Sequence, residues 1–299
     1  MSLSQTDVRR GELRGGDAPT TNTPQNLMVF VLSMALFGLS NIILEVIPDI
    51  TIGPVDFSVS YFVFVPITLA ALLSPFWVAL GAPLGEIIFT DLLMGDFSGL
   101  AEVEGFIQMF LAIYIAGSVI RNPRSKGQIV LGSLLVVGID KFLSATVDLL
   151  KVWVGVEDAE FVEGLPESVL LLEGIGFGID LIMSGVLFGA IPALWLIPAL
   201  YQRIEPMLGL QPREPGKRIP GSVPRGGWFV AVAILAGIGS FFFAFLEAWD
   251  VEVGSVGGEF RDRFGDGFLW VGVGAIVAIL LIAGILFAVW RGRRGAGER

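Results

Sequence analysis

The sequence predicts an all-α integral membrane protein, in which a six-helix transmembrane core precedes a two-helix transmembrane hairpin and both termini are cytoplasmic. Three observations support this class. Hydrophobic residues make up 54% of the 299 residues, and charged residues only 16%. The mean hydropathy is +0.77, a value typical of membrane proteins rather than soluble domains. Basic and acidic connections also alternate along the chain, as expected when successive loops lie on opposite sides of a membrane.

Apolar runs define the predicted spans, because a helix needs about 17 to 25 residues to cross ~30 Å of hydrocarbon. The run 58–73 is short for one span, and the run 167–200 is long for one. Residues 58–95 have to cross twice, with a helix break at Ser74-Pro75-Phe76. The predicted spans lie at 27–48, 58–73, 77–95, 104–120, 127–150, 167–200, 228–247 and 268–290.

The charge of the connections predicts the orientation. Cytoplasmic loops of membrane proteins carry an excess of Lys and Arg, so the basic stretches are expected inside and the acidic stretches outside. This assignment gives a multi-pass protein of the cell membrane with both termini cytoplasmic. The basic stretches lie before residue 27 and at 121–126, 201–227 and 291–299, and the acidic stretches at 49–56, 91–104, 157–167 and 248–267.

Composition along the chain predicts five segments. The stretch 203–226 is rich in proline, glycine and charge, which is typical of a linker. The expected segments are a disordered cytoplasmic tail (1–26), a six-span core (27–205), a cytoplasmic linker (206–226), a two-span hairpin (227–292) and a basic cytoplasmic tail (293–299).

The residue inventory argues against several function classes. Cysteine and histidine are both absent, so no disulfide can form and no zinc or haem site can use the usual ligands. The commonest general base is missing as well, and no P-loop or paired nucleophile and base is visible. We therefore expect no enzyme, no cofactor and no metal. The expected partners are the lipid bilayer and a small solute, with no nucleic acid.

Ionisable residues within the predicted spans are the candidate site residues, because a charge near a helix centre costs at least ~2.5–3.5 kcal/mol on insertion scales. Ser144 is added because it shares one helix face with Asp140 and Asp148. Glu86 is ten residues past Phe76, which places it about 15 Å into its span. The candidates for substrate binding or a polar cavity are Glu86, Asp91, Asp140, Lys141, Ser144, Asp148, Glu173 and Asp180.

Two interpretations of these residues remain open. One is a polar cavity between the third, fifth and sixth spans. The other is an internal set of ion pairs that holds the helices in register, with Lys141 neutralised by Asp180 or by Glu86. Several acids against one deep lysine favour the cavity, because some of the acids then have to be protonated, face water or meet a cation.

The run ITLAALLSPFWVALGAPLGE, from Ile67 to Glu86, resembles the second-to-third helix region of the substrate-binding S components of energy-coupling factor (ECF) transporters. Those proteins show a small-residue helix, a tight Gly-Pro-type break and a glycine-rich helix that carries an acid. Here Ser74 replaces the usual glycine, and Glu86 stands where the family often has aspartate. The six-span core is also similar. The small-residue spacing by which the family docks its shared transmembrane subunit is not clear in the first span.

The resemblance implies capture of a small micronutrient or vitamin-like solute, with import powered by the shared ECF transmembrane subunit and separate ATPase subunits. Two other functions remain open. The protein could be a proton-coupled secondary transporter that uses Glu86, Asp140 or Asp180 as the proton carrier. It could also be a non-transporting membrane scaffold whose hairpin binds a partner.

Overall fold

The computed structural model describes residues 23–44, 50–52, 55–57, 59–93, 97, 99, 102–156, 162–224 and 226–248. Most of the predicted N-terminal tail, the second helix of the predicted hairpin (268–290) and the basic C-terminal tail lie outside the described residues. The described part is built of helices, apart from a short antiparallel hairpin of β1 (Ile50–Ile52) and β2 (Val55–Phe57) that the sequence did not predict.

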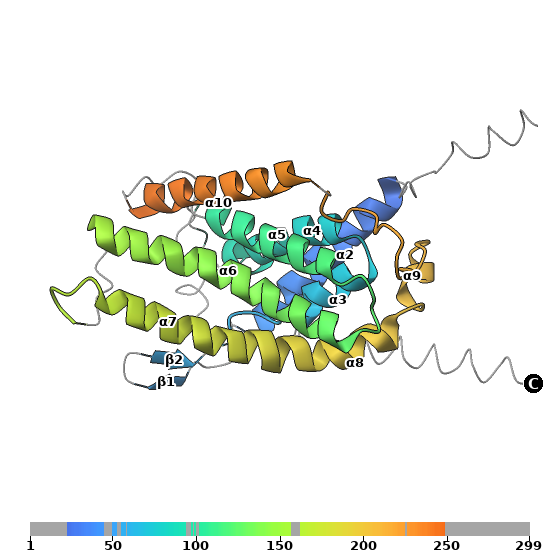
Figure 1. Cartoon of the computed structure of the whole chain (residues 1–299), viewed down its shortest axis with the longest axis horizontal. Helices are drawn as coiled ribbons and strands as arrows, with labels where there is room; N and C mark the ends of the chain where they lie inside the picture. Colours follow the sequence, from blue (N-terminus) through green and yellow to red (C-terminus); the bar gives the residue numbers. More distant parts are fainter. Residues whose placement is uncertain are drawn as a thin grey trace, which may run out of the picture.

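Five of the helices in the described part are long and apolar enough to cross a membrane. They run along the long axis of the molecule, with α10 and α7–α8 on opposite sides (Figure 1). The helices are α2 (Thr23–Leu44), α5 (Glu102–Val119), α6 (Lys126–Val154), the continuous α7–η3–α8 (Ser168–Asp180, Leu181–Ala190 and Ile191–Leu200) and α10 (Gly227–Ala248).

The predicted span 58–73 is not one helix. Its helical part is α3 (Phe64–Leu72), whose nine residues cover only about 14 Å. The preceding residues are extended, because Ser60 and Tyr61 are held by side chains of other helices. Pro66 fits in the first turn of α3, where a backbone N–H has no helical acceptor to lose. The core therefore contains a non-helical segment directly before α3.

The expected break between the second and third spans is present. The backbone leaves the helical conformation at Leu73 and Ser74, and α4 (Pro75–Glu86) begins with proline in its first turn. The π-helical segment η1 (Ile87–Leu92) continues α4. Pro83 lies one turn before η1 and cannot donate a helical hydrogen bond, which favours such a local change of register.

Glycines bring α4 into close contact with α2. A Cβ atom on Gly81 would collide with the Phe30 carbonyl and the Ser33 hydroxyl, and one on Gly85 with the backbone of Met34. On the facing helix, a Cβ atom on Gly38 would collide with the Gly85 carbonyl. The G-x-x-x-G spacing of α4 therefore packs the two helix backbones against each other.

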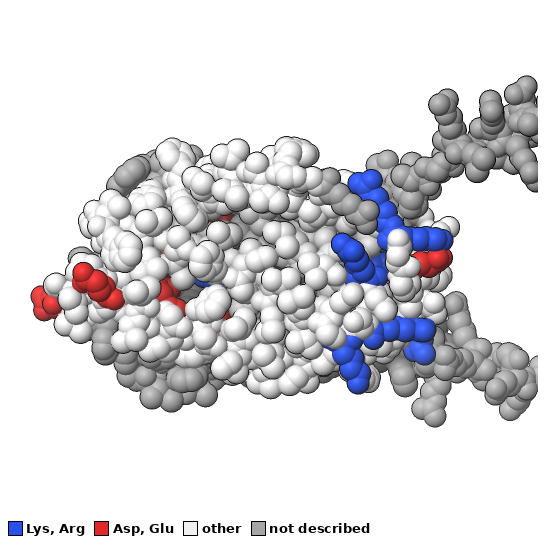
Figure 2. Space-filling view, viewed as in Figure 1, with Lys and Arg blue, Asp and Glu red and all other residues white. Residues whose placement is uncertain are grey.

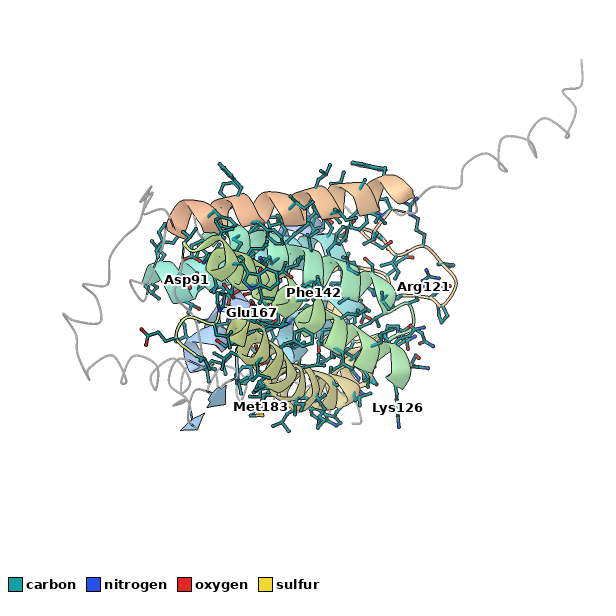
Figure 3. All side chains as sticks on the ribbon, turned by 60° about the vertical axis from the view of Figure 1, so that its left-hand side comes forward. Asp91, Arg121, Lys126, Phe142, Glu167 and Met183 are labelled. Carbon is teal, nitrogen blue, oxygen red and sulfur yellow. The ribbon has the colours of Figure 1, made fainter. Side chains whose placement is uncertain are left out.

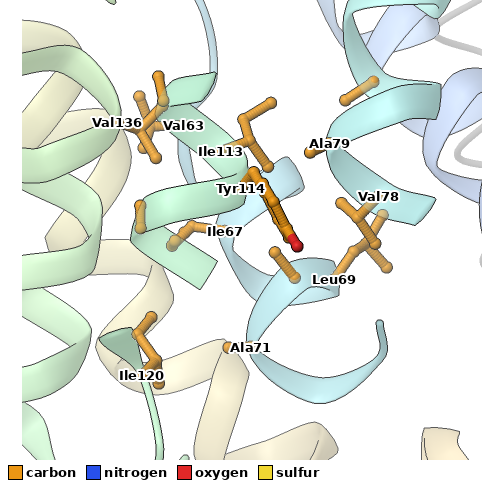
Figure 4. Close-up of a cluster of buried hydrophobic side chains, with 14 of the residues drawn as sticks. Val63, Ile67, Leu69, Ala71, Val78, Ala79, Ile113, Tyr114, Ile120 and Val136 are labelled. Carbon is orange, nitrogen blue, oxygen red and sulfur yellow. The ribbon is translucent and has the colours of Figure 1, made fainter. Parts of the chain in front are cut away.

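The apolar core lies between α3, α4, α5 and α6. Figure 4 shows Val63, Ile67, Ile113 and Val136 meeting there, and all four are fully buried. These side chains come from α3, the residue before it, α5 and α6, so the short α3 lies at the centre of the apolar core.

The stretch from α9 (Ile204–Met207) to residue 224 packs against one end of the helices, so the predicted linker is also a folded cap. Arg213, only 5% exposed, donates hydrogen bonds to the carbonyls of Gly117 (3.2 Å) and Ile120 (2.6 Å). It also donates to the carbonyls of Ala70 and, at 2.9 Å, Leu73. These carbonyls close α5 and α3, whose last turns have no helical donors.

Further hydrogen bonds hold the cap against the ends of the helices. The Gly221 carbonyl accepts from the Phe76 N–H at 3.1 Å, and the Val223 N–H donates to Ser118 Oγ at 3.0 Å. Burial lowers the pKa of Arg213 to about 9, so the guanidinium keeps its charge at neutral pH, and the buried Glu205 favours the charged form. Residues far apart in the sequence thus form one end of the core.

The described surface is polarised along the long axis. On the face in Figure 2, lysines and arginines gather at the end that carries α9, and most carboxylates lie at the opposite end or within a hollow. Figure 3 places Arg121 and Lys126 at the first end, and Asp91 and Glu167 towards the other. This polarity follows the alternation of loop charges in the sequence.

The contact between α2 and α4 gives a stability prediction. Gly85→Leu is expected to lower the midpoint of thermal unfolding in detergent, because the new side chain has to displace the backbone of Met34, and overpacking of this kind costs about 1–3 kcal/mol. Gly138→Leu on α6 is the matched control, since a Cβ there meets no atom within 4 Å. Equal melting points for the two variants would contradict the packing described.

Candidate functional site

A cavity of about 270 Å³ lies between α4–η1, α5, α6 and the extended segment before α3. Its walls combine carboxylates, one ammonium group, hydroxyls and a few apolar side chains. The lining residues are Ser60, Tyr61, Pro83, Glu86, Ile87, Asp91, Glu102, Gly105, Phe106, Gln108, Met109, Asp140, Lys141 and Ser144.

Tyr61 joins the extended segment to α6. Its hydroxyl donates a hydrogen bond to Asp140 Oδ2 at 2.8 Å. Tyr61 is 2% exposed and Asp140 7% exposed, so this bond is well shielded from solvent. The Tyr61 ring also packs edge-on against Phe37 of α2, with 6.2 Å between the ring centroids. The side chain therefore forms both a wall of the cavity and a contact between helices.

Ser60 joins the same segment to α7 and η3. Its backbone N–H donates to Ser184 Oγ at 3.1 Å, and its hydroxyl donates to Asp180 Oδ1 at 2.5 Å. A backbone N–H that is not part of a helix needs such a partner inside an apolar region. Together, Ser60 and Tyr61 fix the extended segment between two long helices.

Lys141 completes the network. Its Nζ lies 3.8 Å from Asp180 Oδ2 and 5.7 Å from the centroid of the Tyr61 ring. Of the two partners that the sequence left open, Asp180 and Glu86, the ion pair is with Asp180. The separation is at the long end for an ion pair, and the two side chains are 27% and 19% exposed.

Glu86 is the last residue of α4 and lines the cavity. It is half-buried, and it makes no hydrogen bond or ion pair with any residue that the structure describes. Of the four lining carboxylates, it is the one without such a contact in the described part. Asp140 is bonded to Tyr61, and Asp91 and Glu102 have contacts of their own.

The structure brings most of the sequence candidates together. Asp180 is one contact away from the cavity, through Lys141. Asp148, two turns beyond Asp140 on α6, and Glu173 on α7 do not line it. The candidates that line the cavity are Glu86, Asp91, Asp140, Lys141 and Ser144.

Sequence reasoning missed Ser60, Tyr61, Glu102 and Gln108. The signal for the first two was the polar pattern SVSYF at the start of a run too short for a normal span. Gln108 is a lone amide in an apolar helix, and it is buried while donating to Glu104 Oε1 at 2.6 Å. Uncharged polar residues give a weaker signal than charges, and Glu102 was assigned to an outer loop.

The cavity suits non-covalent binding of a polar molecule. Within the described ranges, no three acidic side chains are arranged to hold a metal ion. The lining offers hydrogen-bond acceptors, the second amide N–H of Gln108, the hydroxyl of Ser144 and an excess of negative charge. A small solute could meet both charge and hydrogen-bonding groups there, which is the usual composition of a ligand pocket.

The choice of partner for Lys141 gives a second prediction. A double-mutant cycle with Lys141→Met and Asp180→Asn should show a coupling energy of roughly 0.5–3 kcal/mol in thermal unfolding, because the two side chains form an ion pair. The parallel cycle with Lys141→Met and Glu86→Gln is the control and should be closer to additive. Additivity in the first cycle together with coupling in the second would reverse the assignment.

Comparison with known proteins places the chain in a family. No curated protein and no solved structure matches it significantly. One protein family, DUF8171, matches residues 28–296, from the first turns of α2 almost to the end of the chain. The chain therefore belongs to DUF8171, a family of unknown function.

Proposed function

We propose that this protein is a membrane-embedded solute-capture protein, which takes a small polar solute into the cavity between α4–η1, α5 and α6. The observation that carries the proposal is the cavity itself: charged and hydrogen-bonding side chains from separate helices converge on one space inside an apolar helical body. Ionisable groups at such depth are costly, so their convergence favours a binding site over a purely structural role.

The extended segment at Ser60 and Tyr61 supports the same proposal. Non-helical backbone is tolerated at membrane depth where it is buried in protein or lines a water-filled cavity. Discontinuous helices beside a binding site are a common device of membrane transporters. Here the segment is held by three hydrogen bonds to side chains and forms part of the cavity wall.

The direction of capture follows from the charge polarity. The end that carries α9 is basic, and this end is proposed to be cytoplasmic. Helices α2 and α10 both begin at this end (Figure 1), which supports the predicted cytoplasmic N-terminus. The solute then enters from the acidic, outer end, where Asp91 and Glu102 line the cavity.

The finer proposal is an S component of an ECF transporter, with a vitamin-like solute and ATPase subunits on other chains. The break before Pro75, the glycine-rich α4 and the position of Glu86 in the cavity support it. One feature constrains it: Ser33 and Gly38 of α2 face α4, so they are not free to dock a second subunit. The shared transmembrane subunit would need another face of the protein.

Glu86 favours one alternative, a proton-coupled secondary transporter, because a cavity carboxylate without an ion-pair partner among the described residues can exchange protons with water. The two proposals differ in a reconstitution experiment. Uptake by vesicles that contain this chain alone and a pH gradient would favour the secondary transporter. Co-purification with an ATPase, and no uptake by the chain alone, would favour the S component.

Filling the cavity tests solute capture directly. Gly105 lines the cavity, and a Cβ atom there meets no other atom within 4 Å, so Gly105→Trp should fill the space without disturbing the backbone. We expect a small molecule that co-purifies with the wild-type protein, detected by native mass spectrometry, to be lost from this variant.

The matched control is Gly127→Trp, an equally open helical glycine at the start of α6, outside the cavity. It should keep the bound molecule. Retention of the molecule by a folded Gly105→Trp protein would rule out the cavity as the capture site.

A further inference from the structure

The charge balance of the cavity indicates which kind of solute it fits. Four carboxylates line it, those of Glu86, Asp91, Glu102 and Asp140, against the single ammonium of Lys141. In an apolar surrounding, an excess of negative charge is costly unless a cation or protons offset it. The lining thus favours a positively charged solute over a neutral or anionic one.

Most of the charged side chains that line the cavity already have partners within the protein, and one carboxylate does not. Asp140 accepts the Tyr61 hydroxyl, and Lys141 is drawn to Asp180, which does not line the cavity. Glu86 keeps no hydrogen bond or ion pair within the described part of the chain. Its carboxylate is therefore the lining group that most needs a positive partner.

The position of Lys141 shows that the part of the cavity beside Tyr61 accommodates a cation. Its ammonium lies 5.7 Å from the centroid of the Tyr61 ring, within the range of a cation–π contact. A flexible four-carbon stem lets the same ammonium swing between Asp180 and the cavity carboxylates. Lys141 lies beside Asp180 in this structure, and its stem also lets the ammonium reach towards the cavity, where it competes with a cationic solute for the carboxylates.

The remaining walls are apolar. Phe106 and Met109 of α5 line the cavity, and they offer an aromatic ring and a thioether to a hydrocarbon group. The cavity volume is about 270 Å³. A compact molecule with one charged end and one short apolar end fits this space.

We infer that the captured solute is a small organic cation, with an ammonium group that pairs with Glu86 over Tyr61 and a short apolar part against Phe106 and Met109. The ammonium of Lys141 competes with this cation for the cavity carboxylates and thereby limits the affinity of the cavity for it. The inference rests on the proposed function and adds the class of solute to it.

The test uses three probes of similar size and different charge: n-butylammonium, 1-butanol and butyrate. Binding to the full-length protein in nanodiscs is followed by titration calorimetry and by thermal unfolding at constant ionic strength. The Gly105→Trp protein is the blank, because it reports partition of each probe into lipid. We expect n-butylammonium to bind and stabilise the wild type, and the other two probes to match the blank.

Two variants test the named residues. Glu86→Gln should weaken n-butylammonium binding about tenfold or more, the order expected when a desolvated charge pair is lost. Lys141→Met should strengthen it several-fold, because the competing ammonium is gone. The matched controls are Glu167→Gln and Lys126→Met, which make the same changes at exposed positions at opposite ends of the molecule and should leave affinity unchanged.

The outcomes separate this inference from the proposed function. Binding of butyrate or 1-butanol in preference to the amine would overturn the cationic class and leave solute capture standing. Unchanged amine binding in Glu86→Gln, or weaker binding in Lys141→Met, would overturn the assigned roles. If none of the probes binds above the blank, the cation inference fails. Solute capture is then tested independently by whether Gly105→Trp loses the co-purified molecule.

Discussion

The structure depends on one constraint: polar groups inside an apolar helical body have to find partners. Ser60 and Tyr61 satisfy it by bonding to Asp180, Ser184 and Asp140, and these bonds hold the chain extended where a continuous span was expected. Helix α3 is short, and the cavity beside the segment that precedes it is lined by side chains from α4, η1, α5 and α6. The same bonds that satisfy the buried groups therefore create the cavity.

Two contacts outside the cavity keep its walls in register. Glycines let α4 lie directly on α2, which fixes the helix that carries Glu86. At the opposite end, Arg213 binds the last carbonyls of α3 and α5 together, so the short helix and one cavity wall share an anchor. Four hydrogen bonds from one guanidinium offset the cost of burying its charge. The cavity is thus supported by contacts that lie outside it.

Hydropathy predicted the long apolar helices and the broken span at Ser74, because both depend on local composition. The convergence of Glu86, Asp140 and Lys141 was also predictable, since deep charges avoid lipid. Tyr61 and Ser60 were not, because uncharged residues at the start of an apolar run resemble the end of an ordinary span. The burial of Arg213 depends on two helix ends that meet only in the tertiary structure, and its proline-rich surroundings are typical of a linker.

The central claim is that the cavity opens to water at the acidic, outer end and not at the basic one. The chain has no native cysteine, so Ser144→Cys places a single thiol on the cavity wall. A membrane-impermeant thiol reagent applied to intact cells should label this thiol, and adding Gly105→Trp should slow the labelling. Ser125→Cys, at the start of α6 near the basic end, should react only after the cells are permeabilised. Labelling of Ser144→Cys only after permeabilisation, or no labelling at all, would contradict the account.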